Sequence, residues 1–228
     1  MLKSELFEIT VLTRESSTHN FPSGVAVKKV DYTDLESLST ALKGQDALIS
    51  TVALKAVPSQ RLLIDAAVKA GVKRVIPSEF GADLKNAKSR ALPCFAGKVE
   101  IEKYLDELAV RGLMSYTLLF TGPFIDMCLR EGLFFDFKGR TANLYDGGHQ
   151  LISMSRLSTA GKAVRRILTH PRETADRAIW VKDIDVSQNQ LLKLAQALTP
   201  SDKWATKKVS AEGLGKEEDI LKAIFFSE

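Results

Sequence analysis

The feature that most constrains the fold is the alternation of short β-rich runs with longer amphipathic runs. Apolar runs rich in β-branched residues occur at 9–13, 25–30, 47–52, 74–77 and 116–120. Between the later runs, apolar residues recur at helical spacing. Near-continuous apolar strands joined by helices predict a mostly parallel sheet with helices on both faces, which is a doubly wound α/β fold.

Local signals place three helices between these strands. Thr33 and Glu36 match a capping box that opens the first helix. Pro58 suits the first turn of a second helix, which ends at Gly71. An amphipathic pattern over residues 95–108 predicts the third.

The pattern changes after residue 123. Residues 134–145 are aromatic-rich and irregular. The segments that follow are a short strand at 151–154, a helix at 157–168, a strand at 178–181, a helix opened by a capping box at Ser187 and Gln190, and a terminal stretch from Ala211. We therefore expect an incomplete Rossmann-like domain over residues 1–123 and a smaller α/β subdomain over residues 124–228.

The charge pattern argues against nucleic-acid binding. The chain has 228 residues, a formal net charge of +4 and an isoelectric point near 9.0. Its basic pairs at 28–29, 165–166 and 207–208 are far apart in sequence, and no aromatic residues are interleaved with them for base stacking. We expect no nucleic-acid partner.

Other patterns bear on location and on metal chemistry. No run approaches the roughly 20 apolar residues of a membrane helix, and no signal-peptide segment follows Met1, so we expect a cytoplasmic protein without a membrane role. Cys94 and Cys128 lack ligand spacing and are expected to be buried reduced thiols. The three histidines are far apart in sequence, so no metal site is expected.

The carboxyl ends of the strands are where a doubly wound sheet binds its ligand. Arg14 follows the first strand run, and an arginine there suits a 2′-phosphate, which favours NADP over NAD; the competing interpretation is a solvated surface residue. Two runs that end later strands on the same side, 50–52 and 77–81, could line a cofactor groove. The residues in them expected to contact the cofactor are Thr51, Val52, Ser78 and Phe80.

Residues 60–81, which end in Pro-Ser-Glu-Phe-Gly, closely resemble the isoflavone reductase-like, NmrA-like branch of the atypical short-chain dehydrogenases. Residues 11–15 resemble that family's second strand with its arginine. Residues 31–34, 41–46 and 115–117 also fit, and the region after residue 147 resembles the family least. The resemblance implies an NADPH-dependent oxidoreductase that reduces a small phenolic or related aromatic substrate.

The same resemblance singles out Lys98. The family's catalytic lysine follows a phenylalanine by three residues, and Phe95-Ala96-Gly97-Lys98 matches that pattern. The resemblance therefore implies that Lys98 transfers a proton or holds the substrate. From the residues alone, Lys98 would be a solvated partner of Glu102, four residues further along the same helix.

Glu102 departs from the plant reductases, which commonly carry an arginine at this position. A carboxylate there would favour the charged lysine and make Lys98 a poorer base. This departure leaves open a second function, a non-catalytic NmrA-type regulator that binds a dinucleotide and a protein partner.

A dinucleotide site normally includes a strand, a glycine-rich turn and a helix whose N-terminus faces the pyrophosphate. None of the 14 glycines falls in a GxGxxG or GxxGxxG array, and residues 1–7 resemble only the tail of the family's first helix. The missing strand would leave two neighbouring strands without their shared hydrogen-bond partner. Two explanations remain open: a fragment of a normal reductase, or a shortened product with weak or no cofactor binding.

Overall fold

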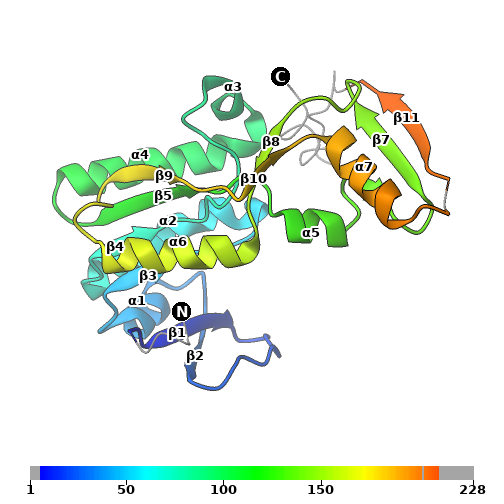
Figure 1. Cartoon of the computed structure of the whole chain (residues 1–228). Helices are drawn as coiled ribbons and strands as arrows, with labels where there is room; N and C mark the ends of the chain where they lie inside the picture. The colour runs from blue at the N-terminus through cyan, green and yellow to red at the C-terminus, as the bar shows by residue number, and fades with distance from the viewer. Residues whose placement is uncertain (1–5, 202, 211–228) are drawn as a thin grey trace. The chain divides into compact units, whose positions relative to one another are not determined.

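The computed structural model describes residues 6–201 and 203–210 and divides into two compact units (Figure 1). The first unit comprises Met1–Glu79, Gly97–Leu119 and Gly161–Ile179; the second comprises Phe80–Ala96, Phe120–Ala160 and Trp180–Glu228. The chain thus crosses between the units several times, whereas the sequence pattern predicts one boundary after residue 123. The segment from Ala211, and residues 1–5 of the expected helix tail, lie outside the described residues.

The larger sheet of the first unit has four strands, and the first three in its spatial order run parallel. It contains β3 (Ala47–Ile49), β4 (Arg74–Ile76), β5 (Ser115–Phe120) and β9 (Arg177–Trp180), in that order. Register pairs Ala47 with Arg74, and Arg74 with Ser115. The predicted α/β fold with parallel strands is therefore confirmed.

Two further strands form a separate sheet. β1 (Ile9–Arg14) pairs in parallel with β2 (Val25–Val30), from Ile9 opposite Val25 to Arg14 opposite Val30. Among the residues that the structure describes, β1 pairs with no other strand, and β3 pairs only with β4. Two sheets thus stand where a doubly wound fold has one continuous sheet.

Helices cover both faces of the four-stranded sheet. Figure 1 shows α6 (Leu157–Thr169) in front of this sheet and α2 (Gln60–Ala70) and α4 (Ala96–Val110) behind it. The layers meet over apolar side chains that are almost fully buried, among them Ile64, Ala66, Ile76, Leu105 and Leu118. Burial of such side chains is the main favourable contribution to folding.

The start of α1 (Leu35–Leu42) corrects one prediction. Its N-cap is Asp34, not Thr33: the Asp34 carboxylate accepts hydrogen bonds from the backbone N–H groups of Glu36 and Ser37. Thr33 instead donates its hydroxyl hydrogen bond to Asp31. A carboxylate can accept from two backbone donors and interacts favourably with the positive end of the helix, which accounts for the shift by one residue.

The start of α2 corrects a second prediction, which placed Pro58 in the first turn of this helix. Pro58 lies in a 3₁₀ helix, η2 (Leu54–Ser59), and α2 begins only at Gln60. The Ser59 hydroxyl donates to the Ala56 carbonyl (2.7 Å) within this tighter turn. Such turns are frequent before α-helices, and proline is tolerated where its missing N–H would have no helical partner.

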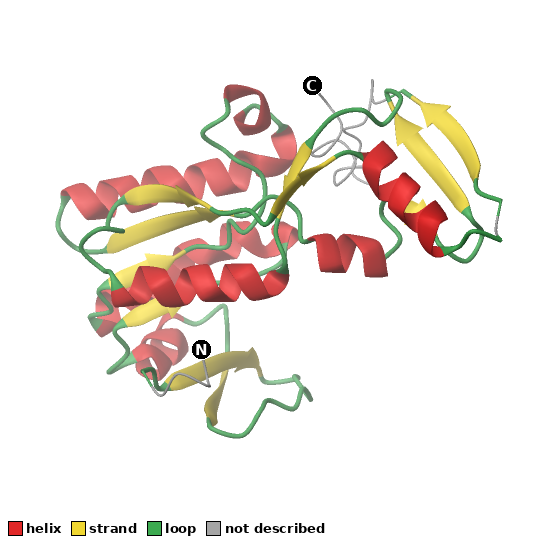
Figure 2. Cartoon of the chain, in the orientation of Figure 1, coloured by secondary structure: helices red, strands yellow, loops and turns green. Residues whose placement is uncertain are grey.

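The second unit contains small sheets and short helices (Figure 2). α3 (Ala87–Arg90) and α5 (Ile125–Arg130) precede β6 (Phe135–Asp136) and β7 (Thr141–Tyr145). The remaining elements are β8 (Ile152–Met154), β10 (Ile184–Val186), α7 (Gln188–Leu198) and β11 (Ala205–Val209). The predicted capping box of Ser187 and Gln190 at the start of α7 is confirmed.

The sequence pattern predicts that residues 134–145 are irregular, but the structure contains paired strands there. β6 and β7 pair antiparallel, and β7 also pairs in parallel with β11. Phe135, Phe137 and Trp204 meet edge to face at centroid distances of 5.8–6.0 Å, which anchors these strands. The partner strand lies about 60 residues later in the chain, so local sequence carries no signal for the pairing.

Cysteine burial differs from the prediction in one case. Cys128 is buried, and burial raises the pKa of its thiol to about 11. Cys94 is only half-buried. Neither is in a disulfide among the described residues.

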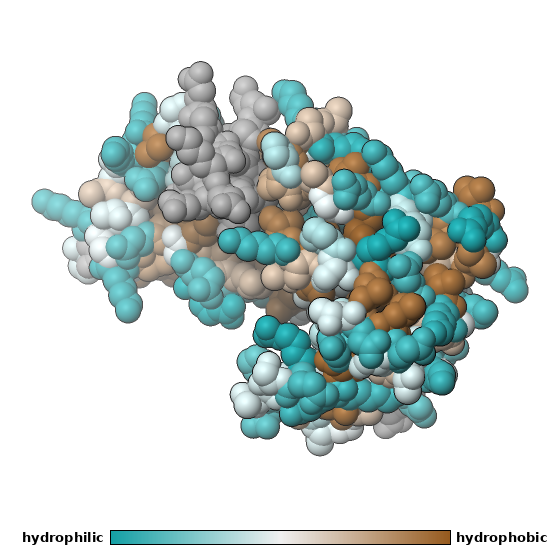
Figure 3. All heavy atoms as spheres, turned by 180° about the vertical axis from the view of Figure 1, so that it is seen from behind, coloured by the Kyte–Doolittle hydropathy of each residue, from teal (hydrophilic) through white to brown (hydrophobic). Residues whose placement is uncertain are grey.

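On the face seen in Figure 3, hydrophilic side chains are spread among smaller groups of hydrophobic ones. No helix in the described part of the chain combines the length and the hydropathy needed to cross a bilayer.

Candidate functional site

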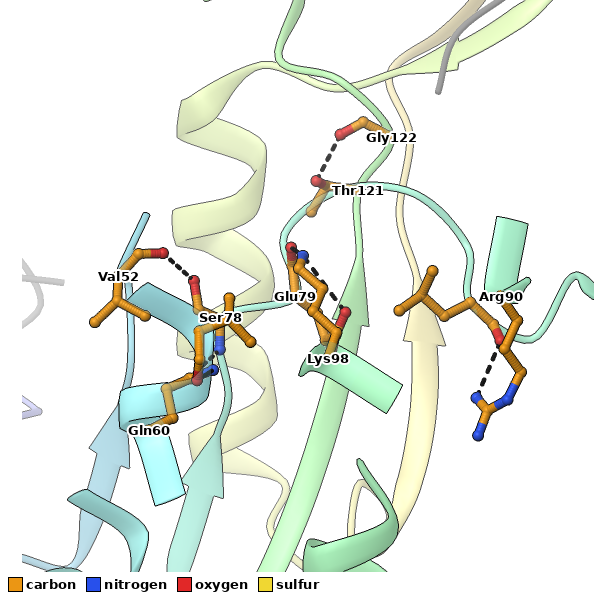
Figure 4. A network of polar contacts seen from close by, with 10 residues as sticks. Val52, Gln60, Ser78, Glu79, Arg90, Lys98, Thr121 and Gly122 are labelled. Atoms are coloured by element: carbon orange, nitrogen blue, oxygen red, sulfur yellow. Dashed lines mark hydrogen bonds and ion pairs between the residues drawn. The ribbon is translucent and has the colours of Figure 1, made fainter. Parts of the chain in front are cut away.

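The carboxyl ends of β3 and β4 are joined through Ser78 (Figure 4). The Ser78 hydroxyl donates to the Val52 carbonyl (2.7 Å), and its backbone N–H donates to Oε1 of Gln60 (2.8 Å). Gln60 is 2% exposed, and its Nε2 donates to the Val57 carbonyl (3.3 Å). Because an unpaired buried N–H is costly, Gln60 fixes the backbone at Ser78.

Lys98 lies in the first turns of α4 and reaches the residue after Ser78. Its Nζ donates to the Glu79 carbonyl oxygen (2.5 Å) and lies 3.6 Å from Glu79 Oε2 (Figure 4). Lys98 is 7% exposed and Glu79 is 5% exposed. The alternative of a solvated Lys98 is therefore wrong. Glu102, expected as its solvated partner, is itself buried at 3% exposure.

Gly97 explains how the start of α4 can pack so closely. A Cβ at this position would lie 3.3 Å from Cγ of Pro58 and 3.6 Å from Cγ1 of Val57, both in η2. Glycine thus allows the first turn of α4 to approach η2, which leads directly into α2 and Gln60.

Arg14 and Thr51 are placed differently from this group. Arg14 is the last residue of β1, whereas the sequence pattern ends this strand at Thr13, and its side chain is exposed in the two-stranded sheet. Its carbonyl accepts a hydrogen bond from the Ser17 N–H (2.9 Å). Nearby, burial raises the pKa of Tyr32, while the Arg14 charge acts in the opposite direction. Thr51, next to Val52, is exposed.

Phe80 follows Glu79 and belongs to the second unit. It is half-buried, and its φ of 38° lies in the left-handed region, which is rare for an aromatic residue. Such conformations cost about 1–3 kcal/mol and cluster at functional sites. In the same unit, the Gly81 carbonyl accepts hydrogen bonds from the backbone N–H groups of Thr121 (3.2 Å) and Gly122 (3.0 Å).

Ser50 and Glu79 lie in the strand-end runs that the sequence places beside a cofactor groove, but sequence reasoning assigns no contact to either. Glu79 lies inside the recognised motif, but only its contacts with Lys98 make it a candidate. Ser50 follows β3 and is 5% exposed, and among the described residues its hydroxyl has no hydrogen-bond partner. A buried polar group without a partner is uncommon, so Ser50 is a candidate ligand contact.

Comparison with known proteins gives the same relationship as the sequence motifs. The model of the NmrA-like family matches residues 1–212. Oxidoreductase aprR of Aspergillus flavus is 38% identical over 210 residues, which are 90% of this chain and 70% of that protein. Oxidoreductase poxI of Penicillium oxalicum is 34% identical over 220 residues, 93% of this chain and 68% of that protein. The resemblance inferred from sequence is confirmed.

Solved structures support the fold. A structure of AtPrR2 with NADP⁺ and (+)pinoresinol aligns with a TM-score of 0.76 at 22% identity, covering 96% of this chain and 77% of that one. An isoflavone reductase aligns with a TM-score of 0.72 at 20% identity, covering 95% of this chain and 78% of that one.

Proposed function

Because the chain belongs to the NmrA-like family, we propose that it is an oxidoreductase that uses NADPH to reduce a small phenolic or related aromatic compound. The observation that carries the proposal is the buried Lys98 ammonium beside the joined ends of β3 and β4. Support comes from the two fungal relatives, both named oxidoreductases, and from the NADP⁺ and (+)pinoresinol complex of AtPrR2.

The residues of this chain offer groups for the 2′-phosphate of NADPH and polar groups at the strand ends, but no glycine array for its pyrophosphate. Arg14 offers an exposed guanidinium at a strand end, which suits the 2′-phosphate. The Ser50 hydroxyl, which has no hydrogen-bond partner within the described part of the chain, offers a polar group at a strand end, and Thr51, Val52 and Ser78 lie at the same and the neighbouring strand end. The sequence holds no glycine array for the pyrophosphate, so we assign no residue to that group. Phe80, which belongs to the second unit, stays a predicted cofactor contact on its strand-end position alone.

When bound, NADPH supplies the hydride. The residues of this chain would bind and orient the reactants, and Lys98 would hold an oxygen of the substrate or pass a proton to it. A charged ammonium suits the donation of a hydrogen bond to an oxygen that gains electron density. Burial of Lys98 strengthens this interaction, because less water competes for its N–H groups.

Fluorescence titration tests the cofactor. We expect NADPH to bind more tightly than NADH, and Arg14→Ala to remove about tenfold to a hundredfold of that preference, since hydrogen bonds to charged groups contribute about 1.5–3 kcal/mol. Lys29→Ala, at a neighbouring exposed cation whose Nζ donates to the Glu15 carbonyl (3.0 Å), is the matched control. Absence of NADPH binding would overturn the proposal.

NADPH oxidation followed by absorbance, across a panel of small phenolic compounds, tests the reaction. Lys98→Met should lower turnover while leaving NADPH affinity within about threefold, because the proton and substrate contacts are lost but the cofactor contacts remain.

A second candidate is a dinucleotide-binding regulator without turnover. The ion pair between Lys98 and Glu79 favours it, because a lysine held in its charged form is a poor base. NADPH binding without oxidation over the whole panel, together with a protein partner whose binding depends on NADPH, would select this function over the reductase.

A further inference from the structure

We propose that Glu79 is the positioning residue of this site, which fixes both the direction and the charge of Lys98. The proposal rests on the proposed function for its catalytic consequence only. The contact between the two side chains can be tested whether or not the protein turns over a substrate.

One residue supplies two kinds of contact to the same nitrogen. The Glu79 carbonyl accepts from Lys98 Nζ at 2.5 Å, and the Glu79 carboxylate lies 3.6 Å from it. The carbonyl fixes a direction for one of the three N–H donors of the ammonium, and the carboxylate compensates its charge. Loss of the carboxylate would therefore leave the direction partly defined but remove the negative charge that Glu79 places beside the ammonium.

Burial makes this compensation necessary. The Lys98 side chain is 8% exposed and the Glu79 side chain is 2% exposed, so neither charge is well solvated. A buried cation without a counter-charge shifts toward its neutral form. The other carboxylate nearby in sequence, Glu102, is buried on α4 itself, one turn beyond Lys98.

The contact between Lys98 and Glu79 also links α4 to the end of β4. Glu79 follows Ser78, whose backbone is held by Gln60, and Lys98 belongs to α4. The ion pair thus ties the start of α4 to the end of β4. We infer that Glu79 sets where the ammonium points relative to the strand ends, which is a requirement for placing it against a reacting oxygen.

The test is the titration of the Lys98 ammonium by ¹⁵N nuclear magnetic resonance, with the signal assigned from Lys98→Met. In Glu79→Gln, which keeps the size of the side chain, we expect the titration midpoint to fall by about 1–3 pH units. Glu100 is an exposed glutamate on α4, the helix that carries Lys98, so Glu100→Gln is the control and should leave the titration midpoint unchanged. A midpoint in Glu79→Gln equal to that of the wild type would overturn the proposal.

Thermal melting keeps the test decisive if Glu79→Gln folds poorly. The double variant Glu79→Gln/Lys98→Met removes both charges, so we expect it to melt at a higher temperature than Glu79→Gln alone. Equal or lower melting of the double variant would show that the two side chains are not coupled, and would overturn the proposal.

Steady-state kinetics then separates the proposal from the proposed function. Glu79→Gln should lower kcat at least tenfold and shift the pH profile of kcat, with the KM for NADPH unchanged. Glu79→Asp, which keeps the charge, should recover part of the activity. If the wild type shows no turnover, the reductase function fails, while the titration and the melting still decide whether Glu79 holds Lys98.

Discussion

The Ser78 hydroxyl donates a 2.7 Å hydrogen bond to the backbone carbonyl of Val52, and this bond joins the end of β4 to the segment that leaves β3. Ser78 is 8% exposed, so the bond is shielded from water. It holds together two residues that strand-end reasoning places in one cofactor groove.

Ser78→Ala should lower the free energy of unfolding by about 1 kcal/mol, because the Val52 carbonyl loses this donor in a buried setting. Urea denaturation measures the change. Ser59→Ala, which removes an exposed serine hydroxyl that donates to the Ala56 carbonyl, should cost less than about 0.5 kcal/mol. Equal losses in the two variants would mean that the bond between the strand ends contributes nothing particular.

Sequence reasoning succeeded where a local signal determines the structure. The short apolar runs became β1, β2, β3, β4 and β5. The capping box at Ser187 formed as predicted, because its two hydrogen bonds close within one turn. Arg14 lies at the end of β1 for the same reason, since the boundary follows from the run of β-branched residues that precedes it.

Sequence reasoning failed where the structure depends on a contact between residues far apart in the chain. β7 depends on β11, and Glu79 becomes a candidate only because α4 carries Lys98 to it, 19 residues later. Ser50 is a further case, since the absence of a hydrogen-bond partner is a property of packing and not of any motif.

Gly122 is predicted to tolerate no side chain. Its φ is +60°, and an added Cβ would lie 1.9 Å from the Ser153 carbonyl oxygen, so the backbone itself must move. Gly122→Ala should lower the free energy of unfolding by more than about 3 kcal/mol. Gly112→Ala is the matched control, because Gly112 has a φ of +68° with nothing within 4 Å. It should cost only about 1 kcal/mol.

A loss in Gly122→Ala no larger than that in Gly112→Ala would contradict the close approach of Gly122 and Ser153. Urea denaturation of both variants under identical conditions makes the comparison.

Asp183 should stabilise the start of α6 in a pH-dependent way. Its carboxylate accepts the backbone N–H of Arg156 (2.8 Å) and a hydrogen bond from Thr159, and these contacts lower its pKa to about 2. Because the folded-state pKa is below the unfolded value of about 3.9, the stabilisation is present above the unfolded value and is lost as pH falls through about 2.

Asp183→Asn should therefore melt at a lower temperature than the wild type at pH 6, and the difference should shrink as the pH approaches 2. Glu131→Gln, which removes an exposed carboxylate that pairs with the adjacent Arg130, should show a smaller difference at pH 6. A difference between Asp183→Asn and the wild type that is the same at both pH values would refute the assignment.

Ser50 gives a prediction whose outcome depends on the ligand. Its hydroxyl is buried without a hydrogen-bond partner among the described residues, so folding has desolvated it without compensation. Ser50→Ala should therefore raise the free energy of unfolding, by about 1 kcal/mol, in the absence of NADPH. Ser39→Ala is the control: Ser39 is as buried, but its hydroxyl donates to the Glu36 carbonyl (3.2 Å), so that variant should be destabilised.

If the Ser50 hydroxyl contacts the cofactor, saturating NADPH should raise the melting temperature of the wild type more than that of Ser50→Ala, since ligand stabilisation grows with affinity. A Ser50→Ala variant that is less stable than the wild type without NADPH would show that the hydroxyl already has a partner, and its candidacy as a ligand contact would end there.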